Sequence, residues 1–428
     1  MTALVHYLRY TLPGIGKATI PPAAKPRWLG PGLLVAVGFV DPGNWATDLQ
    51  AGARYGYTLT GAVILASLMG WLFQHLSARL ALATGRDLAS LIRHQFPAAV
   101  ADLAWLAAEL AIIATTMAEL LGSAIALQLL LGLPLGTGIG LAAMAGCLVL
   151  IGSRHRASEQ HEYVVAGLLA VVSVSFLALL HRAHPSPQAA WQGLLHSGSA
   201  LQHPAMLAMV AGLIGATVMP HNLYLHSGMT ASRVQAAPPE QRVALASATE
   251  ADTFRGLSLA ALVNLAILML AAATLSRPGL IVDSLAHAHQ AIAVSLGSAA
   301  ALVFALALYA AGQSSTLTGM LAGRQIRRGF ARGGGLPGPA LWLSRGLGTA
   351  CCLLLVLFVP GLSADRVLVW TQDVLALVLP FALLPLVILV SRRRLMGRFT
   401  LGRPMLGLAI AATAVILYLD ASQIASLI

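Results

Sequence analysis

Two four-residue segments interrupt long apolar stretches of this chain, and each joins a helix-breaking proline to polar side chains. They are Asp-Pro-Gly-Asn at 41–44 and Met-Pro-His-Asn at 219–222. A broken helix beside ionisable groups is tolerated at membrane depth only where its backbone packs in protein or lines a cavity. We therefore expect both segments to face one shared polar space inside a membrane protein.

The composition of the chain also indicates a membrane protein. Its 428 residues are 58% hydrophobic and 10% charged, with a mean hydropathy of +0.80. That is more apolar surface than one soluble core can bury, so we expect an all-α polytopic protein whose partner is the lipid bilayer. The net charge of +11 comes from short basic clusters between apolar stretches, which indicate a positive-inside bias and no nucleic-acid binding.

At about 20 residues per membrane span, the apolar stretches predict eleven spans. Their expected ranges are 30–54, 57–78, 97–131, 137–152, 162–181, 202–230, 252–275, 290–323, 341–361, 364–391 and 401–424. With the N-terminus inside, residues 1–29 form a cytoplasmic tail and the C-terminus lies outside. All but four of the 26 Lys and Arg residues then face the cytoplasm, including Arg154, Arg156 and the run that ends at Arg332. The four exceptions are Arg54, Arg182, Arg277 and Arg366.

The same orientation makes 182–201 and 277–289 external loops. We interpret their histidines as loop polarity, with metal capture as the less favoured alternative; they are His184, His196, His287 and His289. The glycine-rich segment 333–338 is expected to be a flexible internal connector, because no strand precedes it as in a phosphate-binding loop.

The two interrupted segments also indicate an internal repeat. Proline and asparagine occupy the same positions in each, and the segments fall in spans 1 and 6. The halves 30–181 and 202–391 then contain five spans each, so the second half is inverted relative to the first. In such repeats the broken helices meet near the membrane midplane and bind substrate. Span 11, at 401–424, is an appendage.

The polar groups of the two segments predict a cation site. An ionised Asp41 at membrane depth costs about 2.5–3.5 kcal/mol, and no Lys or Arg is expected at its depth, so a bound cation or proton is expected to offset the charge. Pro42 and Pro220 each free a carbonyl of the preceding turn, and for Pro220 this is the Ala216 carbonyl. Asn44 offers a further oxygen, although it could instead cap the second half of its helix.

Met219 indicates the class of ion. It takes the place in the second segment that the aspartate takes in the first, although a lone methionine is more often a core residue. A thioether contributes little to Ca²⁺ or Mg²⁺ and more to Mn²⁺, Fe²⁺, Co²⁺, Zn²⁺ or Cd²⁺. We therefore expect a transition-metal site at which Ca²⁺ and Mg²⁺ are poor substrates.

The segments 41–57 and 219–227 resemble the signature segments of the Nramp family, whose bacterial members are called MntH. Weaker similarity occurs at 118–122, 262–266 and 379–386. The resemblance implies a LeuT-like fold and proton-coupled import of divalent metals, with metal as substrate and no cofactor. It also implies a bacterial inner-membrane protein, which we expect to be a monomer. The implied metal ligands are Asp41, Asn44, the Ala216 carbonyl, Met219 and, in one conformation, Gln372.

The expected proton pathway contains Asp41, His221 and Glu119. His221 lies two residues after the methionine and cannot face the same way on a regular helix, so it is expected to line a neighbouring pathway. Glu119, in the middle of span 3, is a second relay candidate or a hydrogen-bonded core acid. Two positions depart from the family: Thr116 replaces a common aspartate, and Ser344 replaces the first of two arginines. These two departures concern the proton route and leave the expected metal ligands unchanged.

Two other classes of protein remain as alternatives. An intramembrane metalloenzyme is disfavoured, because His221 and His226 lack the spacing and the glutamate of a His-Glu-x-x-His site. A sodium- or proton-coupled symporter of small organic solutes on the same fold is the stronger alternative, since a fold does not fix function. We expect an alternating-access importer of Mn²⁺ and related ions that is not an enzyme.

Overall fold

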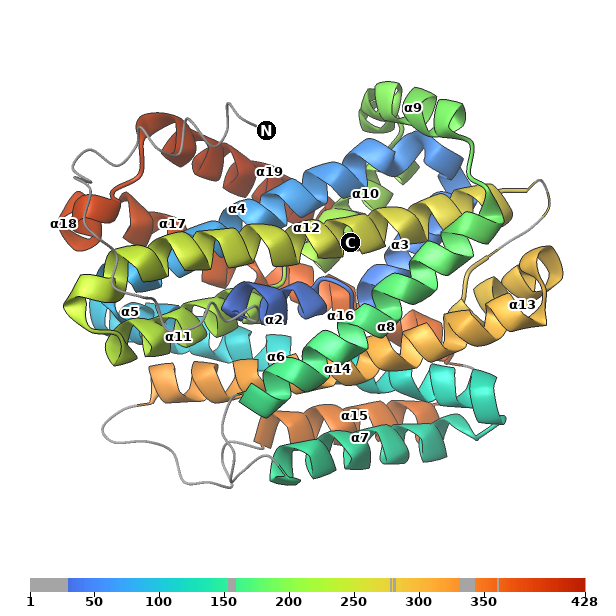
Figure 1. Ribbon diagram of the computed structural model, residues 1–428, viewed down its shortest axis with the longest axis horizontal. Helices are drawn as coiled ribbons and strands as arrows, with labels where there is room; N and C mark the ends of the chain where they lie inside the picture. The colour runs from blue at the N-terminus through green and yellow to red at the C-terminus, as the bar shows by residue number, and fades with distance from the viewer. Residues whose placement is uncertain are drawn as a thin grey trace.

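The computed structural model describes residues 30–152, 159–277, 279, 282–331, 343–359 and 362–427 (Figure 1). Within these residues the secondary structure is helical and contains no strand, which confirms the predicted all-α fold. The predicted tail 1–29, Arg154, Arg156, Arg332 and the connector 333–338 lie outside the described residues.

A helix or a broken helix occupies each of the eleven predicted ranges. In chain order these are α2 (Pro31–Gly38) with α3 (Pro42–Tyr55), α4 (Thr60–Thr84), α6 (Ala98–Leu131), α7 (Leu135–Gly152), α8 (Glu159–Ala183), α10 (Pro204–Thr217) with α11 (Pro220–Ala236), α12 (Arg242–Thr274), α14 (Ser298–Phe330), α15 (Leu343–Phe358), α16 (Ala364–Val378) with α17 (Pro380–Ser391), and α19 (Arg403–Leu427). By length and composition, eight stretches of the described chain can cross a membrane, and α7 and α15 include shorter apolar segments. The exact count of eleven spans stays a prediction.

Shorter elements connect the long helices. They are η1 (Gly56–Leu59), α5 (Leu88–Gln95), α9 (Pro187–Leu195), η2 (Ser197–Gln202), η3 (Pro239–Gln241), α13 (Leu285–Leu296), α18 (Arg393–Met396) and η5 (Gly397–Phe399). The segments 182–201 and 277–289, which we expected to be loops, therefore contain helical turns.

One predicted span begins later in the structure for a local reason. Span 8 was expected to begin at residue 290, but α14 begins at Ser298 because Gly297 adopts a φ of 93° and separates it from α13. Span 10 keeps its predicted range 364–391, and one helical hydrogen bond is missing within it because Pro380 has no N–H to donate.

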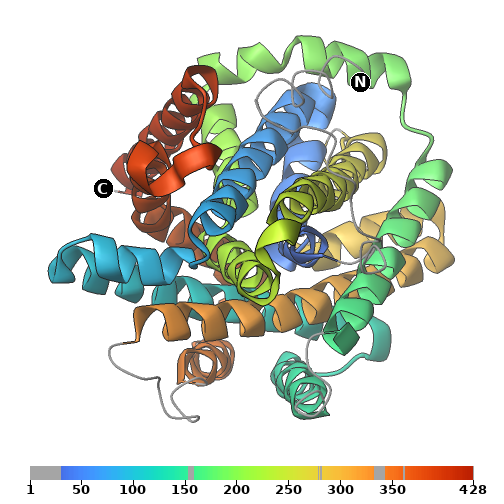
Figure 2. The same cartoon turned by 60° about the vertical axis from the view of Figure 1, so that its left-hand side comes forward.

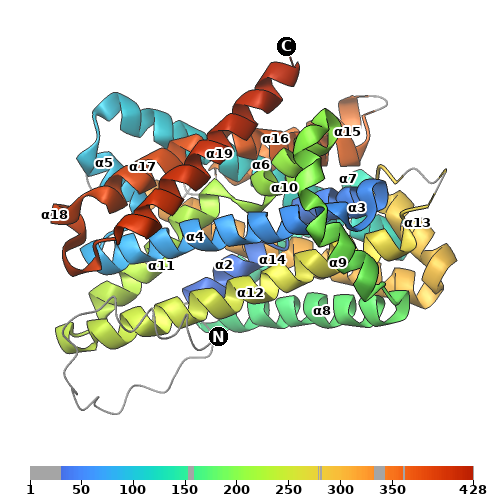
Figure 3. The same ribbon diagram turned by 90° about the horizontal axis from the view of Figure 1, so that it is seen from above.

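The bundle is arranged around α6 and α14, which pack along one another. The α7 and α15 pair packs against α6 and lies at the lower edge of the molecule (Figures 1 and 2). On another side α19 packs against α10 and α17. Seen from above, α2 and α3 follow one another along α12 (Figure 3). The first broken helix is thus enclosed by other helices.

The two broken helices pack against each other in opposite directions. The second half of the first broken helix, α3, contacts the first half of the second, α10. The first half of the first, α2, contacts the second half of the second, α11. The interruptions therefore lie at the same level of the bundle.

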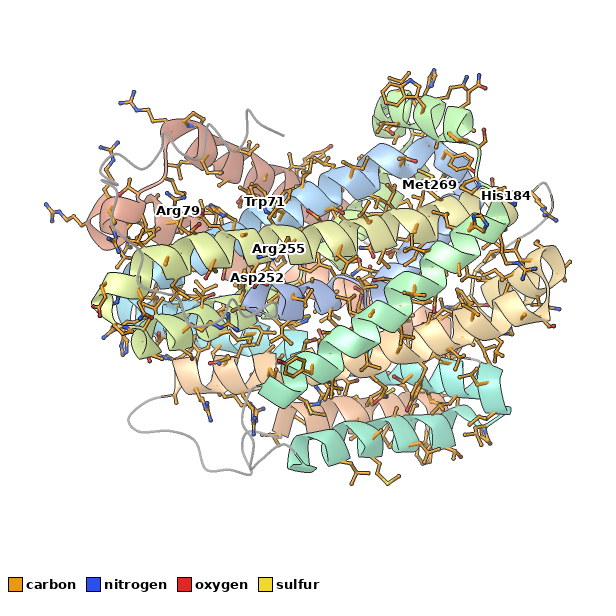
Figure 4. All side chains as sticks on the ribbon, in the orientation of Figure 1. Trp71, Arg79, His184, Asp252, Arg255 and Met269 are labelled. Carbon is orange, nitrogen blue, oxygen red and sulfur yellow. The ribbon has the colours of Figure 1, made fainter. Side chains whose placement is uncertain are left out.

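The start of α2 is attached to α12 by Asp252. The carboxylate Oδ2 accepts a hydrogen bond of 2.7 Å from the backbone N–H of Gly32, and Figure 4 labels this side chain on α12 beside α2. An acidic group at a helix N-terminus satisfies a free donor and interacts favourably with the helix dipole. This contact helps to fix the approach of α2 to the first interruption.

Candidate metal site

The first interruption lies between the end of α2 at Gly38 and the start of α3 at Pro42. Pro42 occupies the first position of α3, where its missing N–H leaves no bond unmade. Asp41 is the N-cap residue: its Oδ1 accepts hydrogen bonds of 2.9 Å from the backbone N–H and from the side-chain amide of Asn44. Asn44 was an alternative candidate for the helix cap, but Asp41 takes that position, and the Asn44 amide donates to its carboxylate.

The second interruption lies between the end of α10 at Thr217 and the start of α11 at Pro220. Val218 and Met219 between them leave the helical conformation, with ψ values of 85° and 126°. Pro220 has no N–H to offer the carbonyl of Ala216, four residues earlier, so this carbonyl lacks its helical partner. The predicted release of the Ala216 carbonyl therefore follows directly from the structure of the helix.

The two interruptions are joined by polar contacts between side chains. The hydroxyl of Thr217 donates to the carbonyl of Leu213 in its own helix, at 2.6 Å, and its Oγ1 lies 3.4 Å from Oδ1 of Asn44 at the first interruption. Met219 is 1% exposed, and its Sδ accepts a hydrogen bond of 3.6 Å from Nδ2 of Asn222. The carboxylate, amide and thioether groups expected from the sequence are therefore buried around paired interruptions.

Four side-chain oxygen atoms near these interruptions are buried without a hydrogen-bond partner. They are Oδ2 of Asp41, Oδ1 of Asn222, Oδ1 of Asn264 and Oε1 of Gln372. A Cβ on Gly43 would lie 2.5 Å from Cδ of Gln372, so the glutamine amide packs directly on the start of α3. Buried polar atoms in a folded protein are normally paired, and unpaired acceptors at one site indicate a missing donor or cation.

Asp41 has no basic partner within the described residues. The same part of the chain contains no group of three or more His, Cys, Asp or Glu residues suited to a metal ion. A site built from one carboxylate, amide and main-chain oxygens and one thioether does not depend on such a group. Its donor set combines hard oxygens with a soft sulfur, which suits divalent transition metals.

Of the expected proton-carrying residues besides Asp41, Glu119 lies on α6 and His221 on α11. Glu119 pairs with Arg345 of α15, with Oε2 at 3.3 Å from Nη2, while its Oε1 has no partner. His221 Nδ1 lies 3.1 Å from the hydroxyl of Thr115. Thr116 donates instead to its own helix, at the carbonyl of Ile112. Glu119 is thus a buried, hydrogen-bonded acid whose partner is an arginine, and its role as a proton relay stays a prediction.

The second position that departs from the family contacts a separate ion pair. Arg327 of α14 bonds both carboxylate oxygens of Glu109, at 2.9 Å each, and donates a further bond of 2.7 Å to the hydroxyl of Ser344. Ser344 stands where the family has an arginine, and in this structure its hydroxyl accepts a hydrogen bond from Arg327 of another helix. This contact could not be predicted from sequence spacing, because the three residues lie on three different helices.

Sequence reasoning missed several polar residues at the interruptions. Asn264 of α12 donates a hydrogen bond of 2.8 Å to the carbonyl of Phe39. The indole N–H of Trp45 donates one of 3.1 Å to the carbonyl of Val40. For Asn222 a signal existed, since it matches Asn44 in the repeated segment; for Asn264 the signal was a lone amide in an apolar span.

The family of the chain follows from comparison with known proteins. The family model described as natural resistance-associated macrophage protein-like, Nramp, matches residues 32–426. The Pseudomonas aeruginosa protein named divalent metal cation transporter MntH 1 is 42% identical over 402 residues, which cover 91% of each chain. A protein of the same name, MntH, from a Nostoc species is 40% identical and covers 91% of this chain and 90% of its own.

Solved structures with the same fold include transporters of two kinds. A crystal structure of the Eremococcus coleocola manganese transporter, in complex with an aromatic bis-isothiourea compound, matches with a TM-score of 0.84 at 29% identity. It covers 96% of this chain and 89% of that one. Mhp1, a nucleobase–cation symporter, matches with a TM-score of 0.59 at 16% identity and shares the fold alone.

The enclosed pair of broken helices and these structural matches define a multi-pass membrane transporter of LeuT-like fold, and not an enzyme. The family match covers nearly the whole described chain. The chain belongs to the Nramp family.

Proposed function

We propose that this protein imports Mn²⁺ and related divalent transition metals, such as Fe²⁺, Co²⁺ and Cd²⁺, by alternating access. The observation that carries the proposal is the meeting of two interrupted helices, at which Asp41 and Asn44 approach the segment that ends in Met219. The names of the relatives support the same class of substrate. The metal is the cargo of the protein and not a resident cofactor.

The proposed ligands are Asp41, Asn44, the Ala216 carbonyl, Met219 and Gln372. One carboxylate oxygen of Asp41 already accepts two hydrogen bonds, which leaves Oδ2 for a cation. The unpaired Oε1 of Gln372 fits a role as a further oxygen ligand. The thioether is the ligand that favours transition metals over Ca²⁺ and Mg²⁺.

We propose proton coupling through Asp41, His221 and Glu119. The support is geometric: two of these groups have an unpaired buried oxygen, and His221 has a hydroxyl partner on the helix that carries Glu119. Thr116 cannot ionise, so any proton route passes through other groups. The Glu119–Arg345 pair, three residues after Thr116 on α6, supplies ionisable groups that could replace the missing aspartate in this route.

The remaining proposals concern the whole molecule. Residues 30–181 and 202–391 form the two inverted repeats and 401–424 is the appended span, in agreement with the opposite directions of the two broken helices. The distribution of Lys and Arg favours a cytoplasmic N-terminus in the bacterial inner membrane. We expect the monomer to be the transporting unit.

The test is equilibrium binding and uptake of Mn²⁺ by an Asp41→Ala variant. We expect the variant to lose Mn²⁺ binding and uptake while the protein stays folded. Glu240→Ala is the matched control, because this acid is exposed in η3, beyond the end of α11 that is far from the second interruption. Retained binding in Asp41→Ala would mean that the site is elsewhere, and metal-independent uptake of a small organic solute would favour the symporter alternative.

A further inference from the structure

The first interruption leaves three backbone carbonyl groups without a helical hydrogen-bond partner, and two of them accept hydrogen bonds from side chains instead. Pro42 leaves the Gly38 carbonyl without its helical partner. The next carbonyl, of Phe39, accepts from Nδ2 of Asn264 at 2.8 Å, and the one after it, of Val40, accepts from Nε1 of Trp45 at 3.1 Å. Both donors are buried, with 2% and 0% exposure. They hold the two carbonyls that directly precede Asp41.

The two donors are fixed from different sides of the bundle. The ring of Trp45 packs edge-on against Phe176 of α8, with centroids 4.7 Å apart, and lies 5.5 Å from the ring of Phe304 of α14. Asn264 belongs to α12, along which α2 and α3 lie. The Phe39 carbonyl is thus held by a residue of a neighbouring helix, and the Val40 carbonyl by a residue of α3 whose ring packs on two neighbouring helices.

The number of available oxygens bears on which ion can bind. Ca²⁺ takes six to eight oxygen ligands and Mg²⁺ a regular octahedron of oxygens, whereas transition metals accept fewer oxygens together with nitrogen or sulfur. The proposed side-chain and Ala216 oxygens, with one thioether, fall short of an all-oxygen sphere. Two further carbonyls next to Asp41 would bring the site closer to one.

We propose that Trp45 and Asn264 determine the specificity of the site by withholding the Val40 and Phe39 carbonyls from the bound ion. In this role they are positioning residues, which act through the carbonyls that they hold. This inference rests on the proposed function and adds a second source of selectivity to Met219. It assigns part of the discrimination against Ca²⁺ to hydrogen bonds on the protein backbone.

The test compares the Kd values of Mn²⁺ and Ca²⁺ for the purified full-length protein. Trp45→Phe keeps an aromatic ring against its neighbours but removes the N–H, and Asn264→Leu removes the other donor at similar volume. For each variant we expect Ca²⁺ to bind about 2- to 12-fold more tightly relative to Mn²⁺, the change that one net hydrogen bond represents. Trp105→Phe is the matched control, because it removes an indole hydrogen bond to Glu109 at an exposed position on α6.

The possible results separate this inference from the proposed function. An unchanged ratio of Ca²⁺ to Mn²⁺ affinity in both variants would overturn the inference and leave the metal site intact. Equal weakening of both ions would also overturn it, because Trp45 and Asn264 would then be purely structural. Wild-type protein that binds no Mn²⁺ would reject the proposed function and this inference with it.

Discussion

Gly122 of α6 faces Pro42 at the first interruption, and its replacement by alanine gives a sharp test of the packing there. A Cβ at this position would overlap Cβ and Cγ of the proline ring, which is rigid and adjoins the backbone of Asp41. Carbon atoms pack at about 3.5–4.0 Å, so the ring would have to retreat by about 1 Å or more. Metal–ligand distances are held within about 0.2 Å, so a shift of this size removes Asp41 from a formed site.

Gly122→Ala is expected to change stability through two effects of opposite sign, and to change Mn²⁺ affinity in one direction only. Overpacking costs about 1–3 kcal/mol, whereas alanine gains about 1 kcal/mol over glycine in a helix, so the free energy of unfolding falls by up to about 2 kcal/mol. Mn²⁺ affinity is expected to fall at least about tenfold, which corresponds to about 1.4 kcal/mol.

The assay is calorimetric titration of purified protein with Mn²⁺, together with a thermal unfolding curve. Gly167→Ala is the control, since a Cβ at this exposed position of α8 meets nothing within 4 Å. Wild-type affinity and unchanged stability in Gly122→Ala would refute the close approach of α6 to the interruption.

Three further predictions address the site and its neighbour. Met219→Ala should retain part of the Mn²⁺ uptake while Ca²⁺ or Mg²⁺ compete better, measured as inhibition of uptake; unchanged selectivity would count against the thioether as a ligand. Gly43→Ala should displace the Gln372 amide and weaken Mn²⁺ binding by about 2- to 12-fold, the value of one polar contact, and calorimetry that detects no change would exclude Gln372 as a ligand in this conformation. Arg345→Ala should lower the free energy of unfolding by about 3–5 kcal/mol, because it leaves Glu119 buried without its partner, and added Glu119→Gln should restore part of the loss in denaturant unfolding.

The helix interruptions could be predicted from the sequence because their cause is local. Pro42 and Pro220 lack an N–H whatever surrounds them, and Asp41 caps a helix with the residues that directly follow it. The all-helical fold was predictable from apolar length for a similar reason. Pro380 removes one helical hydrogen bond inside span 10 by the same rule, while the span keeps its predicted range.

The groups that surround the interruptions could not be predicted in this way. The bond from Asn264 to the Phe39 carbonyl joins residues 225 positions apart, and the bond from Arg345 to Glu119 joins residues 226 positions apart. Such contacts depend on which helices pack together, and no local spacing encodes that. Trp45 is close in sequence to Val40, but it bonds the carbonyl only because the backbone leaves the helical conformation between α2 and α3.

The most direct test of the central claim is Mn²⁺ uptake into proteoliposomes, with lumenal pH recorded and excess Ca²⁺ and Mg²⁺ present. The account predicts saturable uptake that resists both competitors and acidifies the lumen. Uptake without acidification would retain the metal site and reject proton coupling through Asp41, His221 and Glu119. Absence of uptake, or its suppression by Ca²⁺ and Mg²⁺, would contradict a transition-metal importer.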